Sequence, residues 1–334
     1  MSGIDRKIVT RRGPIAAVLF YSICVILFPV ILVGYLLWIA MLYSGRKSGV
    51  SGTAQGPLSA RWFQHQLGTR SDEAASRLMM VLPGISPMAV HLVFGPLKIA
   101  SRLSGFVPQA FRYPFEGVVS LQNQASARQT FYDAAVDRYL GSIKQFVILG
   151  AGFDTRAFRL PADLTVRSFE VETAKTLTVK RAVLKKAGID TARCTFVAAD
   201  FEKQDWLNRL VEAGFDRGQP ALFLWEGVTP YLDQEAVEDT FRKVASTASG
   251  SVIAFDYFTS EILESRALYL RMVRKSLLAG GEPLKFGIES TPPLSERVTK
   301  LLQSCGLTLV EQHTVGQETE GKRALGGFAI AIVG

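Results

Sequence analysis

The chain has 334 residues, of which 48% are hydrophobic and 20% charged. This composition excludes a disordered or low-complexity protein and suits one large domain with an accessory segment. The net charge of +8 would suit nucleic acid or an anionic membrane surface, and because no nucleic-acid-binding motif accompanies it we expect a membrane and no nucleic-acid partner. The three cysteines and three histidines are scattered, so neither a disulfide framework nor a metal site is expected.

Residues 1–47 are predicted to form a basic N-terminal region followed by a membrane segment. No charged residue occurs between Arg12 and Arg46, and this apolar run, 13–45, is longer than the ~20 residues that cross a bilayer. Basic residues flank it on both sides, namely Arg6, Lys7, Arg11 and Arg12 before it and Arg46 and Lys47 after it. A continuous helix would place its two ends on opposite sides of the membrane.

The sequence does not determine how many times the chain crosses the membrane. A re-entrant hairpin broken near Pro29 or Gly34 would return the chain to its starting side, and so would a second crossing segment. The uncharged stretch Val81–Leu97 is a candidate, but its prolines and glycines make a poor spanning helix. We interpret it as an interfacial or substrate-capping element within a helical cap over 48–120.

Residues 121–334 alternate apolar strands with amphipathic helices, which predicts a parallel sheet covered on both faces. Helices are expected over 173–187 and 294–305. The predicted strands are Phe146–Leu149, Val166–Val171, Thr195–Ala198, Leu222–Trp225, Val252–Phe255, Leu307–Glu311 and Gly327–Val333. The last two are close in sequence and predict an antiparallel pair. The fold class is therefore α/β, a doubly wound, seven-stranded, mostly parallel sheet of the Rossmann-like class I methyltransferase plan.

The first strand leads directly into Gly150-Ala151-Gly152, followed by Asp154. Glycines at this position let a ligand lie against the backbone at a strand end. Nicotinamide and flavin enzymes also carry Gly-x-Gly, but their fingerprint requires a third glycine where this chain has Thr155. We therefore expect a nucleoside cofactor without a pyrophosphate.

Two acidic strand ends follow. Glu170 and Glu172 point to the same side of the second strand, and either carboxylate could accept both hydroxyls of a ribose, although an ordinary solvated strand end would look the same. Asp200 could accept from an adenine amino group or serve as a helix N-cap. Phe201 could pack on the adenine ring.

Glu226 and Tyr231 follow the fourth strand, where ligands bind in an open parallel sheet. Glu226 could pair with a cofactor ammonium group or meet the substrate. Tyr231 could take part in the chemistry or simply pack.

Four strings resemble the leucine carboxyl methyltransferase-like family, especially its bacterial branch of S-adenosylmethionine-dependent enzymes: residues 149–160, Phe169–Glu172 with Lys180, Ala199–Phe201, and Glu226–Leu232. The resemblance covers roughly 50–334 and implies S-adenosyl-L-methionine as cofactor. It also implies that Arg128 clamps the carboxylate of the cofactor's methionine part, which a planar guanidinium suits. The chain has Glu172 where the family usually has Asp.

The expected function is O-methylation of a small or lipid-like acceptor at the membrane, with a carboxylate slightly favoured over a hydroxyl because it needs no base. We expect a bacterial inner-membrane protein with its catalytic domain in the cytoplasm, where the cofactor is made. Two alternatives remain, a membrane-bound nicotinamide-dependent oxidoreductase and a scaffold that binds the cofactor without catalysis.

Overall fold

The computed structural model describes residues 13–45, 52–161, 163–279, 281–319 and 322–334. A seven-stranded sheet with the order β3-β2-β1-β4-β5-β7-β6 forms its centre. The strands are β1 (Gln145–Leu149), β2 (Arg167–Glu172), β3 (Cys194–Ala198), β4 (Ala221–Trp225), β5 (Val252–Phe258), β6 (Leu307–Val315) and β7 (Gly326–Val333). The first five are parallel, and β7 runs antiparallel to both β5 and β6. All seven predicted strands, and the Rossmann-like class I plan, are confirmed.

Burial explains why these segments form strands. Every residue of β1 and β4 is buried, as expected for central parallel strands with helices on both faces. One face packs on α8 (Trp206–Glu212), α9 (Gln234–Ala245) and α12 (Leu294–Ser304), and the other on α6 (Gln124–Tyr139). The predicted helices 173–187 and 294–305 appear as α7 (Ala174–Lys186) and α12.

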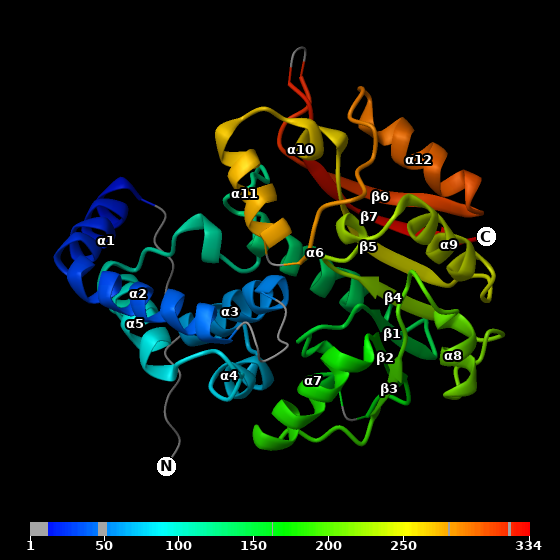
Figure 1. The fold of residues 1–334 in the computed structure, drawn as a ribbon, viewed down its shortest axis with the longest axis horizontal. Helices are drawn as coiled ribbons and strands as arrows, with labels where there is room; N and C mark the ends of the chain where they lie inside the picture. Colours follow the sequence, from blue (N-terminus) through cyan, green and yellow to red (C-terminus); the bar gives the residue numbers. More distant parts are fainter. Residues whose placement is uncertain (1–12, 46–51, 162, 280, 320–321) are drawn as a thin grey trace.

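A helical layer precedes the sheet in the chain and lies to its left in Figure 1. It contains α3 (Gly52–Leu67), α4 (Glu73–Met79) and α5 (Pro87–Ser104), followed by the short turn η2 (Gln109–Phe111). Its apolar core includes Trp62, Phe63 and Val90, and it joins the sheet domain through Val183 and Leu184 of α7. The helical cap is thus packed onto the sheet domain. Of the predicted stretch Val81–Leu97, only the part from Pro87 onward is helical.

The apolar run forms two helices, α1 (Pro14–Ile26) and α2 (Phe28–Gly45), instead of one continuous span. The break falls at Leu27 because Pro29 lacks an amide hydrogen and its ring obstructs a preceding helical turn. No single helix in the described part of the chain is long and apolar enough to cross a bilayer, but the two together are, with a bend of 66° between them. Gly34 lies inside α2, where a Cβ would come within 2.6 Å of Leu92 on α5, so it permits close packing and not a break. The flanking basic residues lie outside the described residues.

Candidate active site

A cavity of about 420 Å³ lies at the carboxyl ends of β1, β2, β4 and β5. All but one of the predicted site residues line it, namely Arg128, Gly150, Ala151, Gly152, Asp154, Glu172, Asp200, Phe201, Glu226 and Tyr231. The helical layer adds Pro57 and Arg61 of α3. The position agrees with the rule that open parallel sheets bind ligands beyond their strand ends.

Gly150 begins the loop between β1 and the short turn η3 (Arg156–Phe158). Its φ is +66°, and a Cβ there would lie 2.3 Å from Cγ2 of Val228. Only glycine tolerates both the left-handed backbone and this close approach. The loop is therefore held against the residues that follow β4, and its backbone faces the cavity.

The two glutamates of β2 have different environments. Glu172 lines the cavity, and its Oε2 accepts from the Gly152 amide at 3.0 Å. Glu170 is fully buried and does not line it; its Oε2 lies 2.7 Å from Nζ of Lys180. Burial raises the pKa of Glu170 to about 7, although Lys180 opposes this shift. Of these two predicted site residues, Glu172 faces the cavity and Glu170 does not.

Lys180 connects Glu170 to the backbone of the Gly-x-Gly loop. Its Nζ donates to the Ala151 carbonyl at 3.4 Å and lies 5.7 Å from the centroid of the Phe158 ring. Both charged groups of the pair are inaccessible to solvent. The pair therefore fastens α7 and β2 to the Gly-x-Gly loop from the side opposite the cavity.

A buried ion network joins the helical layer to the sheet. Arg61 donates to Asp154 and Glu226, both at 2.9 Å. Arg156 contacts the same two carboxylates and also donates to Asp133 at 2.7 Å. Burial acts to raise the pKa of Glu226, but Arg156, Arg61 and Arg128 outweigh it and hold that pKa below its usual value. Sequence reasoning missed this role of Arg61 because nothing near it in the sequence marks a site.

Arg128 stands between two carboxylates at the end of the sheet. Its guanidinium lies 3.2 Å from Asp256 and 3.5 Å from Glu226. The 3.5 Å contact joins Nε of Arg128 to Oε1 of Glu226, and neither of these buried atoms makes a hydrogen bond within the described part of the chain. Buried polar groups are normally hydrogen-bonded, so this ion pair leaves hydrogen-bonding capacity for a ligand in the cavity.

Asp256 was also missed, although it organises the same corner. It accepts from the Gly227 amide at 2.6 Å and from the Tyr132 hydroxyl at 3.2 Å. The hydroxyl of Tyr132 in turn lies 2.8 Å from the Trp225 carbonyl. Burial raises the pKa of Asp256, with Arg128 acting against the shift.

Asp200 and Phe201 form the wall of the cavity beyond β3. Asp200 is not the N-cap of α8, a role that Asp205 fills by accepting from the Asn208 amide. The Asp200 carboxylate instead accepts a hydrogen bond from the Glu202 amide and pairs with Lys203. It remains partly exposed to the cavity. Phe201 is buried against the rings of Trp206 and Trp225. Its position is compatible with an adenine ring beside it.

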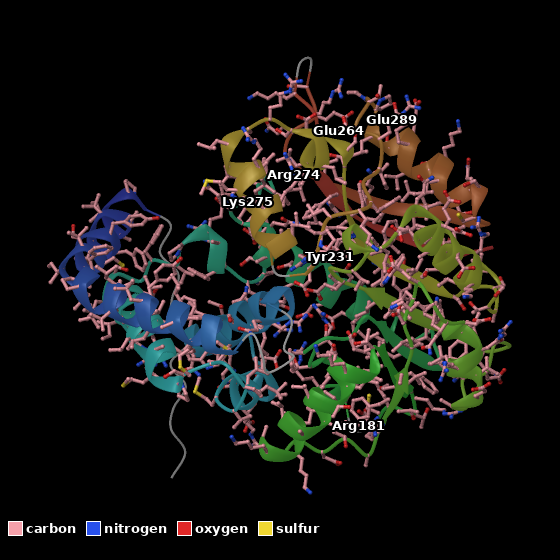
Figure 2. All side chains as sticks on the ribbon, in the orientation of Figure 1. Arg181, Tyr231, Glu264, Arg274, Lys275 and Glu289 are labelled. Atoms are coloured by element: carbon pink, nitrogen blue, oxygen red, sulfur yellow. The ribbon has the colours of Figure 1, made fainter. Side chains whose placement is uncertain are left out.

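Tyr231 ends the turn η4 (Thr229–Tyr231) after β4 and is labelled in Figure 2. It is half-buried and lines the cavity with Pro230 and Leu232. The structure thus places both predicted catalytic residues, Glu226 and Tyr231, in one cavity.

The charges around the cavity are unequal. Its two lining arginines are Arg61 and Arg128, and its lining carboxylates are Asp154, Glu172, Asp200, Glu226, Asp256 and Glu282. Arg156, which does not line the cavity, also binds Asp154 and Glu226, so the acidic excess lies mainly at Glu172, Asp200 and Glu282. Such an excess attracts a cationic ligand and repels a pyrophosphate. The site is therefore chemically suited to a sulfonium or ammonium compound.

Comparisons with known proteins agree with this geometry. Residues 112–245 match the model of the family described as leucine carboxyl methyltransferase. A "Putative S-adenosyl-L-methionine-dependent methyltransferase" of Mycolicibacterium smegmatis is 42% identical over 144 residues, 42% of this chain and 44% of that protein. A "Putative S-adenosyl-L-methionine-dependent methyltransferase" from Frankia alni is 36% identical over 140 residues, 41% of this chain and 49% of that protein. The chain thus spans about half the length of these curated relatives.

Among solved structures, a duf574 family protein from Streptomyces avermitilis is similar with a TM-score of 0.44 and 18% identity, covering 82% of this chain and 96% of that one. The magnesium protoporphyrin IX methyltransferase from Synechocystis, solved with bound SAH, has a TM-score of 0.41 and 13% identity. It covers 66% of this chain and 90% of that one.

Proposed function

We propose that this protein is an S-adenosylmethionine-dependent methyltransferase that methylates an oxygen of its acceptor. The observation that carries the proposal is the acid-rich cavity at the Gly150 loop. In it Arg128 and Glu226 form a 3.5 Å ion pair whose two atoms make no hydrogen bond in the described part of the chain. The family match over 112–245 and the names of the relatives support it. The oxidoreductase alternative gains no support from those relatives, and Thr155 is committed to a hydrogen bond with Asp72.

The cavity residues fit the parts of this cofactor. Arg128 would bind the carboxylate of the methionine part with its guanidinium, and Glu226 would bind the ammonium group with its carboxylate. Both ligand groups would exchange for part of the 3.5 Å ion pair between the two side chains. Glu172 would accept from the ribose hydroxyls, while Asp200 would accept from the adenine amino group beside Phe201. When bound, the cofactor supplies a methyl group on a positively charged sulfur.

The protein's own contribution is alignment and exclusion of water. Glu226 is held by three arginines, and its lowered pKa makes it a weak proton acceptor. A carboxylate acceptor is already ionised and needs no such base, so we favour a carboxylate oxygen over a hydroxyl. Tyr231 would then face the acceptor, while Glu226 holds the ammonium group of the cofactor in the same cavity.

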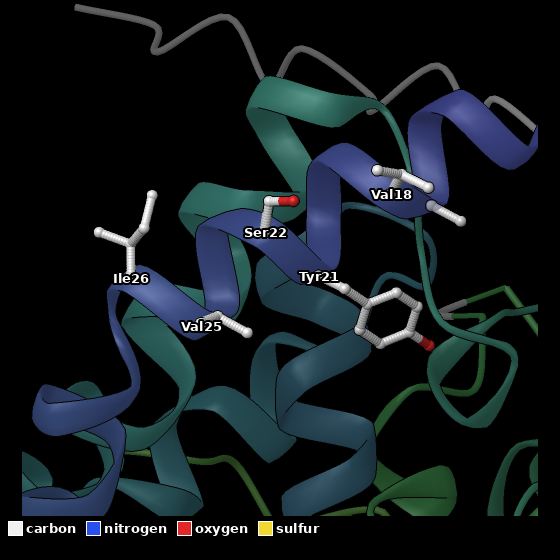
Figure 3. Close-up of a pocket in the computed structure, with 6 residues that line it drawn as sticks. Val18, Tyr21, Ser22, Val25 and Ile26 are labelled. Atoms are coloured by element: carbon white, nitrogen blue, oxygen red, sulfur yellow. The ribbon is translucent and has the colours of Figure 1, made fainter.

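We further propose that α1 and α2 attach the protein to a bacterial inner membrane, with the catalytic domain in the cytoplasm. Figure 3 shows Val18, Tyr21, Val25 and Ile26 projecting from α1, and each is more than half exposed. Exposed apolar surface of this extent is typical of a membrane or protein contact. The bend at Leu27 suits a re-entrant pair that enters and leaves the same face of the bilayer. A lipid-like acceptor would be available there.

Calorimetry on the full-length protein in detergent micelles tests the cofactor. S-adenosylmethionine and S-adenosylhomocysteine should bind in the micromolar range and NADH should not. Arg128→Ala and Asp200→Ala should each weaken binding of the two sulfur ligands. Preference for NADH, or no binding of either sulfur ligand by a folded protein, would reject the proposal. Cofactor binding without methyl transfer to any lipid or carboxylic acid extract would indicate a scaffold.

A further inference from the structure

Helix α11 (Leu268–Ala279) exposes apolar side chains and ends three residues before Glu282, which lines the candidate active site. We infer that α11 lies in the lipid interface as a second membrane contact, so that an amphiphilic acceptor reaches the cavity from the bilayer. This inference rests on the proposed membrane attachment through α1 and α2.

The side chains of α11 divide into three stripes around its axis, at 100° per residue. Leu270 is buried, and Arg274 on the same side is bound to the carbonyls of Ile262 and Ser265. The opposite side exposes Leu268 and Met272, at 71% and 64%. Both side chains of that stripe are thus more than half exposed in the described part of the chain.

Charge and aromatic character border the exposed stripe. Arg271 and Lys275 are exposed on one side of it, and Tyr269 on the other. Figure 2 shows Lys275 and Arg274 on this helix. An apolar ridge flanked by cations and a tyrosine is typical of a helix that lies in the headgroup region of an anionic membrane.

The exposed residues of α11 form a local cluster. In the described part of the chain after Ser104, the other strongly exposed large apolar residues are Val118, Val211 and Val310, each on a different element. Scattered residues of this kind are normal on protein surfaces. On α11, by contrast, Leu268 and Met272 lie about 40° apart with Tyr269 beside them, while Leu278 projects about 80° from Leu268 on the side of Arg271.

The segment after α11 connects this surface to the candidate site. Glu282 lines the cavity, together with Pro57 and Arg61 of α3. Three residues later, the Lys285 amide donates to the Pro230 carbonyl at 2.7 Å, next to Tyr231. A lipid surface contacting α11 would therefore lie next to the residue proposed to face the acceptor.

An anionic bilayer fits α11 better than a second copy of the chain. A dimer through this face would bring Arg271 and Lys275 of two copies together, which like-charge repulsion disfavours. Phosphate headgroups would instead pair with both cations while the apolar ridge enters the acyl region. We therefore assign this surface to phospholipid.

Site-directed fluorescence on the full-length protein tests the inference. In a Cys24→Ser background, Met272→Cys would be labelled with an environment-sensitive dye, since Cys194 and Cys305 are buried. The matched control is Val310→Cys on β6, labelled the same way. With phosphatidylcholine–phosphatidylglycerol vesicles, the dye at 272 should shift to the blue and be quenched by nitroxide lipids, and the dye at 310 should do neither. Adding Arg271→Gln and Lys275→Gln should reduce the quenching at 272 several-fold.

Each outcome decides the inference. Equal quenching at both positions, or none at 272 on vesicle-bound protein, would overturn it. A blue shift at 272 that needs no vesicles and grows with protein concentration would assign the surface to a second copy. Protein that does not bind vesicles would overturn the inference together with the membrane attachment. Calorimetric cofactor binding by the same labelled protein reports separately on the proposed methyltransferase.

Discussion

Arg61 of α3 donates to Oε2 of Glu226 at 2.9 Å, although the two residues are 165 positions apart in the sequence. The same Arg61 nitrogen reaches Asp154 at 2.9 Å. A single side chain of the helical layer thus joins the loop after β1 to the segment after β4. The helical layer is therefore a structural part of the candidate site and not a separate appendage.

Replacing Arg61 should destabilise the protein because it leaves two buried carboxylates with fewer cations. We expect Arg61→Met to lower the free energy of unfolding by about 3 kcal/mol, as for other broken buried ion pairs. The matched control is Arg77→Met on α4, which removes an exposed pair with Glu73 and should cost less than about 1 kcal/mol. Urea unfolding measures both, and equal losses would contradict the structural role of Arg61.

The buried pair of Lys180 and Glu170 gives a pH-dependent prediction. Lys180→Met should remove the cation that favours ionised Glu170, so that this buried carboxyl stays protonated at neutral pH. Burial already raises the pKa of Glu170 to about 7, and in the variant it should rise further. Below the parent pKa the carboxyl is protonated in both folded proteins, so the charge-dependent loss should be small there. Above it the loss should grow by about 1.4 kcal/mol per pH unit until the variant's own pKa is reached.

Thermal unfolding of this variant across pH 5 to 9 measures the effect. The double variant Lys180→Met with Glu170→Gln removes both charges and should recover most of the stability lost above the parent pKa. A loss that does not depend on pH, or a double variant no more stable than the single one, would show that packing and not charge is responsible.

Gly150 should tolerate no side chain, because its backbone is left-handed and because a Cβ would collide with Val228. Gly188 serves as a control that separates these two effects. Gly188 also has a left-handed backbone, with φ of +65° against +66°, but a Cβ there would meet nothing within 4 Å. Gly188→Ala should therefore cost only the backbone term, about 1–2 kcal/mol. Gly150→Ala adds the collision with Val228 and should cost a further ~1–3 kcal/mol while abolishing cofactor binding. Equal costs would mean that the loop moves away from Val228.

Glu172, and not Glu170, should determine affinity for the ribose part of the cofactor. Glu172→Gln removes the charge of a carboxylate that lines the cavity and accepts a hydrogen bond from the Gly152 amide. Charge-assisted hydrogen bonds are roughly twice as strong as neutral ones. We expect S-adenosylhomocysteine to bind about tenfold more weakly by calorimetry. Glu212→Gln on the exposed side of α8 is the control and should leave the affinity unchanged. Unchanged affinity in Glu172→Gln would remove this residue from the proposed site.

Local patterns in the sequence determined the sheet. Runs of buried apolar residues such as Phe146–Leu149 and Leu222–Trp225 predict parallel strands because both faces of such strands are covered by helices. The order of the chain then placed Gly150, Glu172, Asp200 and Glu226 at strand ends. Since parallel strands end at the same edge, these residues had to lie near one another whatever the details of packing.

Only the tertiary structure decided which of the polar residues face the cavity. Glu170 and Glu172 share one side of β2, yet the packing of α7 brings Lys180 onto Glu170 and leaves Glu172 to the cavity. Arg61 and Asp256 lie in unremarkable sequence, and long-range folding alone makes them neighbours of Glu226 and Arg128. Hydrophobic periodicity depends on neighbours three or four positions away, whereas ion pairs between distant segments depend on how whole helices pack. The sequence therefore specified the scaffold, and the packing of α3 and α7 on it specified the site.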